Sequence, residues 1–221
     1  MAEKDSDEPK KSINEGNWPS LLAIILANLG AFAVVVRLNI DFSDALKRLD
    51  LLLPASVGLV IVSVVNGLVP AMYKNRLTFL RWNHPLPGCQ ARKVAIQDDR
   101  IDDKALQKHK PIPTDPKEQN AYWYALYSKI SDLPSVIQAN RNFLLTRDYA
   151  AISFMMIFVL GLAAAWMIPD KPGIVTQYVS GLVIQCALVR WAARNYGIEV
   201  VSNVLARTAA GLSEPHKAHG S

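Results

Sequence analysis

The stretch that decides the fold is residues 149–168, which read YAAISFMMIFVLGLAAAWMI. No acidic or basic side chain interrupts it, and its centre is apolar on every side of a helix. A helix on the surface of a soluble protein keeps a polar face, whereas about 20 apolar residues are long enough to cross the ~30 Å hydrocarbon core of a bilayer. This stretch therefore predicts a transmembrane helix.

Three further stretches share this composition: residues 18–36, 51–73 and 174–189. Each is near the length that a spanning helix needs, and none has a charged residue in its interior. We therefore expect an all-α integral membrane protein with four transmembrane helices, arranged as two hairpins. Pro54 and Pro70 make the second span the least regular of the four.

The polar residues are concentrated between the second and third spans. The predicted organisation is a cytoplasmic N-terminal tail (1–17), a first hairpin (18–73), a cytoplasmic helical insert (74–148), a second hairpin with the cytoplasmic extension of the fourth helix (149–211) and a disordered tail (212–221). In a chain of 221 residues, this layout leaves no room for a large separate catalytic domain.

The distribution of lysine and arginine predicts the orientation. Of the 24 basic residues, those in the connections 37–50 and 169–173, on the far side of a four-span chain, are Arg37, Lys47, Arg48 and Lys171. The others lie in the termini and the insert, which the positive-inside rule places in the cytoplasm. We expect a bacterial inner-membrane protein with both termini cytoplasmic. The connection 38–49 is interpreted as a short turn-helix or as an amphipathic helix on the outer leaflet.

The composition also bears on the partners. The net charge of +5 and the pI near 9.2 are explained by basic flanks that meet anionic lipid head groups. The charges lie beside the spans and form no dense basic run, which argues against nucleic acid. Polar residues such as Asn28 and Gln185 can hydrogen-bond between helices within the membrane. The expected partners are the lipid bilayer, further copies in a homo-oligomer and a cytoplasmic protein.

Local signals predict the course of the insert. Residues 74–82 are basic and aromatic and suit the head-group region, and the prolines of 84–89 form a rigid elbow. A short helix is expected over residues 98–106. Asp115 is expected to cap the next helix, which has Pro116 as its first residue.

The third and fourth spans are predicted to extend beyond the membrane. No helix breaker separates Asp132 and Pro134 from Pro169, so one rod of roughly 35 residues, ~53 Å long, should run from the insert through the third span. The apolar spacing of the fourth span continues as far as Gly211. We expect aromatic residues of the insert to pack on this pair of helices as a small subdomain.

The same region supplies the candidates for binding a cytoplasmic protein, because large aromatic side chains are enriched at interfaces. They lie at the end of the basic and aromatic stretch, in the elbow and on the helix after Asp115: Trp82, His84, Tyr122, Trp123 and Tyr127.

One acidic motif has the spacing of a metal site. Asp98, Asp99 and Asp102 match DDxxD, in which carboxylates one helical turn apart hold magnesium against a diphosphate. The chain lacks the second acidic motif that such enzymes need, so a solvated acidic turn is the stronger interpretation. The three aspartates are weak metal candidates.

The cysteines give a second possible chemistry. His84 and Cys89 could form a nucleophile–base pair or half of a zinc site, but zinc needs four ligands and turn structure explains the pair more simply. Cys186 in the fourth span is interpreted as an inert small hydrophobic residue. We therefore predict no catalytic residue, no metal and no cofactor, and do not expect an enzyme.

Charged residues gather where the third and fourth spans meet the cytoplasm. Ion pairing between adjacent helices is the simpler interpretation, and the vestibule of an anion-attracting pore in an oligomer is the alternative. The absence of ionisable residues inside the predicted spans argues against active transport. The members of this predicted charged ring are Arg141, Arg147, Asp148, Arg190, Arg194 and Glu199.

Three functions are compatible with these features. We favour a non-enzymatic oligomeric membrane effector or channel-like subunit controlled through its insert, an architecture similar to that of small bacterial membrane effectors of anti-phage defence. The alternative is a passive anchor or assembly scaffold for a soluble partner. A third and weaker hypothesis is a lipid- or isoprenoid-processing enzyme that uses the acidic motif.

Overall fold

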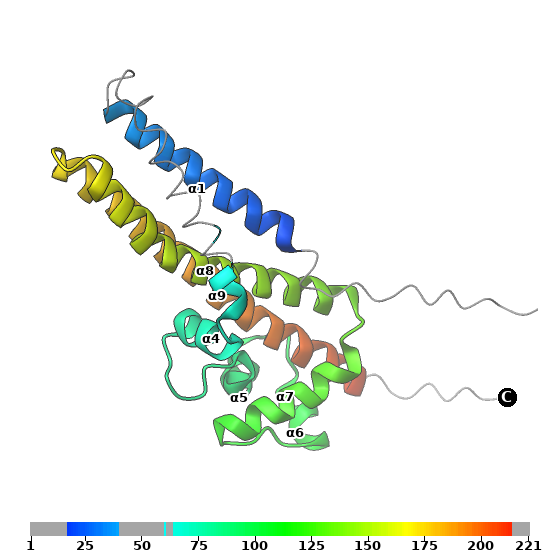
Figure 1. Ribbon diagram of the computed structural model, residues 1–221. Coiled ribbons are helices and arrows are strands. Elements are labelled where there is room, and N and C mark those ends of the chain that lie inside the picture. Colours follow the sequence, from blue (N-terminus) through cyan, green and yellow to red (C-terminus); the bar gives the residue numbers. More distant parts are fainter. Residues whose placement is uncertain (1–16, 40–59, 61–63, 214–221) are drawn as a thin grey trace, which may run out of the picture.

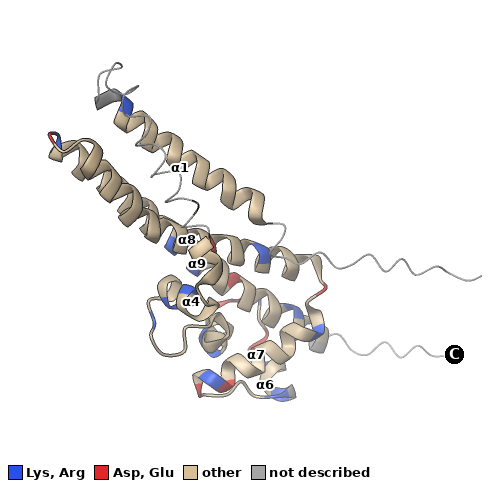
Figure 2. Ribbon diagram, in the orientation of Figure 1, with Lys and Arg blue, Asp and Glu red and all other residues tan. Residues whose placement is uncertain are grey.

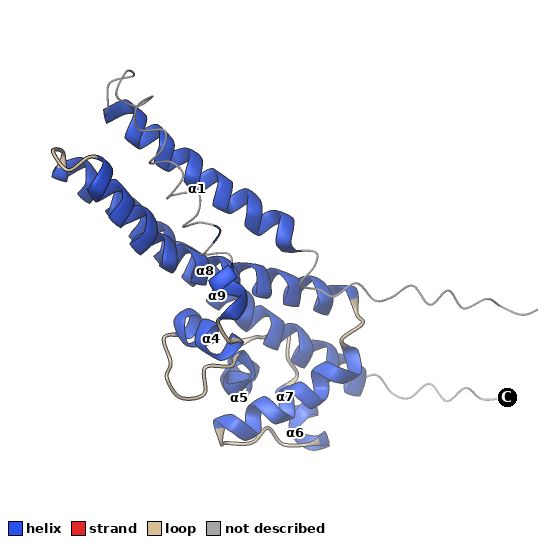
Figure 3. Cartoon of the chain, viewed as in Figure 1, coloured by secondary structure: helices blue, strands red, loops and turns tan. Residues whose placement is uncertain are grey.

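The computed structural model describes residues 17–39, 60 and 64–213, and every regular element in this part of the chain is helical (Figure 3). The elements are α1 (Trp18–Asn39), α4 (Ala71–Phe79), the short 3-10 helix η2 (Pro87–Gln90), α5 (Ala91–Gln97), α6 (Asp103–His109), α7 (Pro116–Ile130), α8 (Pro134–Met167) and α9 (Pro172–Ser213).

Three of these helices are long and apolar enough to cross a membrane: α1, α8 and α9. Helices α8 and α9 form an antiparallel hairpin, and α1 lies along it (Figure 1). Their apolar side chains share one core, in which Phe32 of α1, Met156 of α8 and Leu182 of α9 are buried. The all-α prediction is confirmed for the described residues, and so are three of the four expected apolar helices.

The predicted second span lies largely outside the described residues. Residues 64–68 are helical, but Val69 bends and Pro70 precedes a new helix, α4. The break agrees with the irregularity expected at Pro70, because proline has no backbone N–H and its ring disfavours a continuing helix, and it assigns residues 71–73 to α4 instead of to the predicted span. The interpretation of the connection 38–49 also lies outside the described residues, except that α1 ends at Asn39.

The two predicted rods are confirmed. Helix α8 runs unbroken for 34 residues and α9 for 42, so each continues well beyond its apolar half. Helix α8 begins with Pro134 in its first turn, and α9 ends two residues beyond the predicted stop at Gly211. Both helices therefore extend from the apolar region into the subdomain.

The subdomain wraps the polar ends of these rods with α4 to α7 (Figure 1). Its core joins Tyr122 and Leu126 of α7 to Val201, Val204 and Leu205 of α9, with Trp123 and Tyr127 packed beside them. This confirms the prediction that the aromatic residues of the insert pack on the extended ends of the two long helices. Helix α7 begins as predicted, since the Asp115 carboxylate accepts hydrogen bonds from the backbone N–H groups of Lys117 and Glu118 at 2.9 and 3.0 Å.

The prediction of a short helix over residues 98–106 is wrong for the first half of that range. Helix α5 ends at Gln97 and α6 starts at Asp103, so the acidic motif forms the turn between them. The Asp102 carboxylate accepts from the N–H of Ala105 and caps α6. Aspartate side chains compete for backbone N–H groups in this way, which favours turns and caps over helix interiors.

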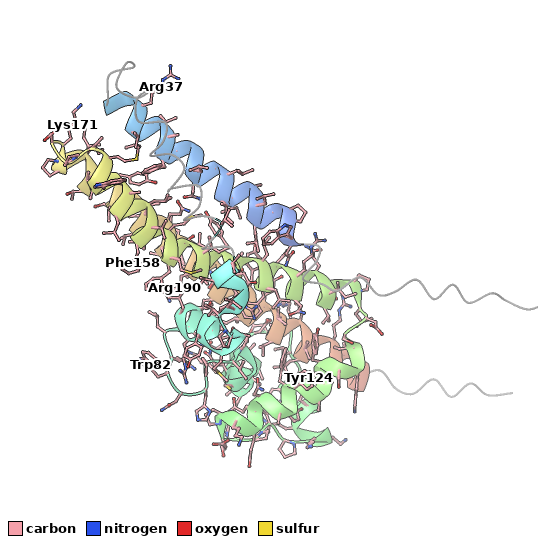
Figure 4. The ribbon with its side chains drawn as sticks, in the orientation of Figure 1. Arg37, Trp82, Tyr124, Phe158, Lys171 and Arg190 are labelled. Carbon is pink, nitrogen blue, oxygen red and sulfur yellow. The ribbon has the colours of Figure 1, made fainter. Side chains whose placement is uncertain are left out.

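Charge separates the two parts of the molecule. Lys, Arg, Asp and Glu lie on the subdomain, on the halves of α8 and α9 that pack against it and at the remote end of the long helices, whereas residues 18–36 of α1 and 149–167 of α8 carry none (Figure 2). Arg37 and Lys171 lie at the end of the long helices that is remote from the subdomain (Figure 4). The uncharged zone between them and the subdomain is the part that suits a hydrocarbon environment.

Candidate functional site at the membrane boundary

Helix α4 lies against both α8 and α9 where their apolar halves meet the subdomain. Its buried face consists of Lys74, Asn75, Thr78 and Phe79, which are spaced one helical turn apart. Three of these four residues are polar, although the face is turned toward the protein interior. Buried polar groups require partners, and the partners of α4 define a junction between the insert and the long helices.

The ammonium group of Lys74 lies 3.2 Å from the Oδ1 of Asp148, with side-chain exposures of 7% and 20%. The Arg147 guanidinium donates to the same carboxylate oxygen at 3.0 and 2.9 Å. Burial lowers the pKa of Lys74, and the nearby Asp148 carboxylate opposes part of that shift. One carboxylate thus balances two cations at the point where α8 turns from polar to apolar.

Helix α9 holds the other end of α4. The guanidinium of Arg190 donates to the backbone carbonyl oxygen of Thr78 at 3.3 Å. A cation is favoured there, because the last carbonyl groups of a helix have no intrahelical partner and carry partial negative charge. The hydroxyl of Thr78 donates to the carbonyl of Lys74 at 2.9 Å and so needs no further partner.

A close aromatic contact completes the junction. The rings of Phe79 and Phe143 are 6.3 Å apart and pack against α9 at Gly197. A Cβ atom at Gly197 would lie 2.7 Å from Cζ of Phe79 and 2.9 Å from Cε2 of Phe143. The absence of a side chain at this position therefore lets the three helices approach one another.

The predicted charged ring is distributed over several places. Arg147 and Asp148 meet Lys74, and Arg190 meets Thr78, as described above. Arg141 donates to the side-chain oxygen of Asn17 at 3.1 Å, which ties the start of α1 to α8. Arg194 lines a pocket with Asp98, and Glu199 is exposed.

The pocket next to Arg194 has a volume of about 510 Å³ and contains Asp98, Asp99, Arg100 and Lys93 in its wall. The Asp98 carboxylate accepts from Arg100 at 2.8 Å and from the hydroxyl of Ser202 on α9. These hydrogen bonds hold the pKa of Asp98 well below its usual range.

These partners bear on the metal hypothesis. The turn at Asp98 is fastened to α9 through Ser202, and Asp102 caps α6. Among the residues that the structure describes, no three His, Cys, Asp or Glu side chains are grouped so that they could hold a metal ion. The described acidic motif therefore has a structural explanation as a turn between two helices.

The aromatic candidates for partner binding fall into two sets. Trp82 is 77% exposed, and His84 is also exposed on the same loop. Tyr122 is buried in the subdomain core, and Trp123 stacks on Tyr127 with ring centres 5.3 Å apart. Burial raises the pKa values of Tyr122 and Tyr127. The surface that is available to a partner thus includes the loop and excludes Tyr122.

The two members of the possible pair of His84 and Cys89 also differ in their exposure to solvent. Cys89 is buried in η2, whereas His84 is exposed on the preceding loop. Burial raises the pKa of the Cys89 thiol, which lowers the fraction of reactive thiolate at neutral pH.

Comparisons of the chain with protein-family models, with curated proteins and with solved structures give no match. The junction is therefore interpreted from its geometry. A buried ion pair, a helix-end contact and a glycine-mediated ring contact hold α4, α8 and α9 together. Sequence reasoning named Arg147, Asp148 and Arg190 but missed Lys74 and Thr78. The one signal in the sequence that could have pointed to Lys74 is its position as a basic residue directly after an apolar stretch.

Proposed function

We propose that this chain is a non-enzymatic, oligomeric membrane effector whose subdomain controls the permeability of the membrane. The observation that carries the proposal is that α9 belongs to both cores. It contributes Leu182 to the core of the apolar helices and Val201, Val204 and Leu205 to the core of the subdomain. A partner or ligand that shifts the subdomain would therefore also shift the membrane part of the same helix.

The proposed topology has four spans. Asn17, at the start of α1, contacts Arg141 near the subdomain, whereas Arg37 lies at the opposite end with Lys171 (Figure 4). Helix α4 starts at Ala71, back at the level of Asp148. The apolar sequence between these points is suited to the return crossing. By the positive-inside rule, we place the subdomain and both termini in the cytoplasm of a bacterial cell, with the spans in its inner membrane.

Support for an oligomer comes from the apolar half of α9. Only 6% of its most apolar window is buried within the described structure, compared with 44% for α8. Gln177, Ser180 and Gly181 are exposed in this half. Polar side chains in hydrocarbon are stabilised by a neighbouring helix, and small residues allow its close approach. A Cβ atom at Gly181 would meet nothing within 4 Å in the described part of the chain, which leaves room for a second copy.

The direct test is the membrane potential of cells in which expression is induced, together with cross-linking to report the oligomer. We expect the wild-type chain to depolarise cells and to cross-link as an oligomer. Gly181→Leu should reduce both signals. Ala187→Leu is the matched control, because this residue is also exposed on α9 but points to a different side. An unchanged potential with full-length, membrane-inserted protein would contradict the proposal.

A passive anchor or assembly scaffold is the second proposal, and one observation favours it. Trp82 and Tyr124 are large aromatic residues that the subdomain leaves exposed. A scaffold should recover a stoichiometric soluble partner in a pull-down and leave the membrane potential unchanged. Replacement of both residues by alanine should then remove the partner while the chain remains in the membrane.

A further inference from the structure

A pocket of about 360 Å³ lies between α4, the loop that follows it and the apolar half of α8. Its wall includes Tyr73, Arg76, Arg81, Trp82 and Phe154, and it contains no acidic residue. The pocket is close to the boundary of the membrane part, since Lys74 on the same helix pairs with Asp148. It is separate from the buried face of α4 that forms the junction.

Arg76 is held in place by Tyr73 and Trp82. Its guanidinium carbon lies 5.1 Å from the centre of the Tyr73 ring and 5.5 Å from that of the Trp82 ring. Aromatic faces attract guanidinium groups and restrict their orientation. The Nε of Arg76 is buried and has no hydrogen-bond partner among the residues that the structure describes. With Arg81 also in the wall, the pocket presents two cationic side chains that suit an anion.

The backbone of the loop is held in an unusual conformation around these residues. Leu80 ends α4 in the left-handed region with φ 51° and ψ 43°, and His84 has φ 53°. Bulky L-residues rarely adopt positive φ, and such conformations are concentrated at ligand sites and clamps. These two residues bracket Arg81 and Trp82, and they turn the chain back so that Trp82 reaches Arg76.

The apolar side of the pocket continues along α8. Phe154 packs edge-on against Phe158 with ring centres 5.3 Å apart, and both are exposed. Leu162 and Trp166 extend the same exposed ridge at intervals of four residues. Trp82 and Phe158 project on the same side of the molecule (Figure 4). The cationic end of the pocket is thus next to a long apolar surface on α8.

We propose that this pocket binds an anionic phospholipid, with its phosphate between Arg76 and Arg81 and one acyl chain along Phe154 and Phe158. The apolar ridge has no function toward a free phosphate ion, so the occupant is a membrane lipid. A zwitterionic lipid gains less, because its own ammonium group competes with the two arginines for the phosphate. This site is independent of the proposed permeability function, and either can fail without the other.

The test uses the full-length protein purified in detergent, with retained lipids counted by native mass spectrometry. Phosphatidylglycerol and phosphatidylcholine with identical acyl chains are the two probes, and inorganic phosphate is the third. We expect retention of phosphatidylglycerol over phosphatidylcholine, and no competition by phosphate. Arg76→Gln and Arg81→Gln should each weaken phosphatidylglycerol binding by roughly fivefold. Lys108→Gln with Arg207→Gln, both exposed and outside the pocket, should have no effect.

Two results of the lipid measurements, and a third from the phosphate competition, would overturn the lipid site. One is equal retention of the two lipids by the wild-type protein, which needs no variant. The other is an unchanged preference in Arg81→Gln and in Trp82→Ala, two exposed positions whose replacement leaves the buried core intact. Displacement of phosphatidylglycerol by inorganic phosphate would instead assign the pocket to a soluble anion and would also overturn the proposal.

Discussion

Lys74 and Asp148 form an ion pair of 3.2 Å at the place where the subdomain meets the membrane helices. Lys74 belongs to the short helix α4, and Asp148 directly precedes the apolar half of α8. A buried ammonium group is tolerated only with a partner, so this contact fixes the position of α4 relative to α8. Movement of the insert would therefore either break this ion pair or move α8 together with α4.

Asp148→Asn should destabilise the protein by about 3 kcal/mol, because it leaves both Lys74 and Arg147 without a carboxylate. Lys74→Met should cost less, since Arg147 still balances Asp148. Unfolding in detergent, followed by circular dichroism, gives both values. Asp170→Asn at the exposed far turn is the control and should change stability by less than about 0.5 kcal/mol. Equal losses for Asp148→Asn and the control would contradict the structural role of the pair.

Gly197→Ala should lower the free energy of unfolding by about 1–3 kcal/mol, because the added methyl group overlaps Phe79 and Phe143. Thermal melting of the purified protein measures the loss. Gly211→Ala is the matched control on the same helix, where no described residue lies within 4 Å of the added atom. That variant should be neutral or more stable, since alanine favours a helix over glycine. Two variants with the same melting temperature would show that the ring contact is loose.

Low pH should loosen the contact between the α5–α6 turn and α9. The folded-state pKa of Asp98 lies below its unfolded value of ~3.9, so its contribution to stability is present above that pH and is lost as the pH falls through the depressed value. The effect should be about 1 kcal/mol or less, because Arg100 is exposed to solvent. Hydrogen exchange at residues 98–103 between pH 5 and pH 3 reports the onset of this loss, because the unfolded-state carboxyl titrates in that range. In the Asp98→Asn variant, the amides of this turn should already exchange faster than in the wild type at pH 5. If the exchange rates of the wild type change with pH only as those of unprotected amides do, Asp98 does not have this role.

Much of the fold follows from local sequence signals. The unbroken helices α8 and α9 follow from continuous apolar spacing, and α7 follows from Asp115 before Pro116. The site depends instead on contacts between residues far apart in the chain, such as Lys74 with Asp148 and Asp98 with Ser202. No periodicity reports such pairs. The acidic motif shows the same limit, since its spacing suited a helix while its side chains bind backbone and arginine groups and form a turn.

The aromatic helix of the insert provides a further prediction. Trp123 stacks on Tyr127 and packs against η2 at Gly88, whereas Tyr124 on the same helix is exposed. Trp123→Ala should destabilise the subdomain by about 2–3 kcal/mol and should speed its cleavage by a low concentration of trypsin. Tyr124→Ala is the matched control and should be cleaved like the wild type. Rapid cleavage of the wild-type insert would show that the subdomain is not a packed unit.

The most direct test of coupling between the subdomain and the spans is the ion permeability of vesicles that contain the purified full-length protein. A bifunctional thiol reagent that contains a disulfide, applied to cysteines introduced at positions 78 and 190, would lock α4 to α9, because the reagent can span the gap that the Arg190 side chain crosses to reach the backbone oxygen of Thr78 at 3.3 Å. We predict that vesicles with wild-type protein leak more than empty vesicles, and that this cross-link changes the leak while reduction restores it. Vesicles that are as tight as empty ones, or a leak that is the same before and after cross-linking, would contradict the proposed coupling.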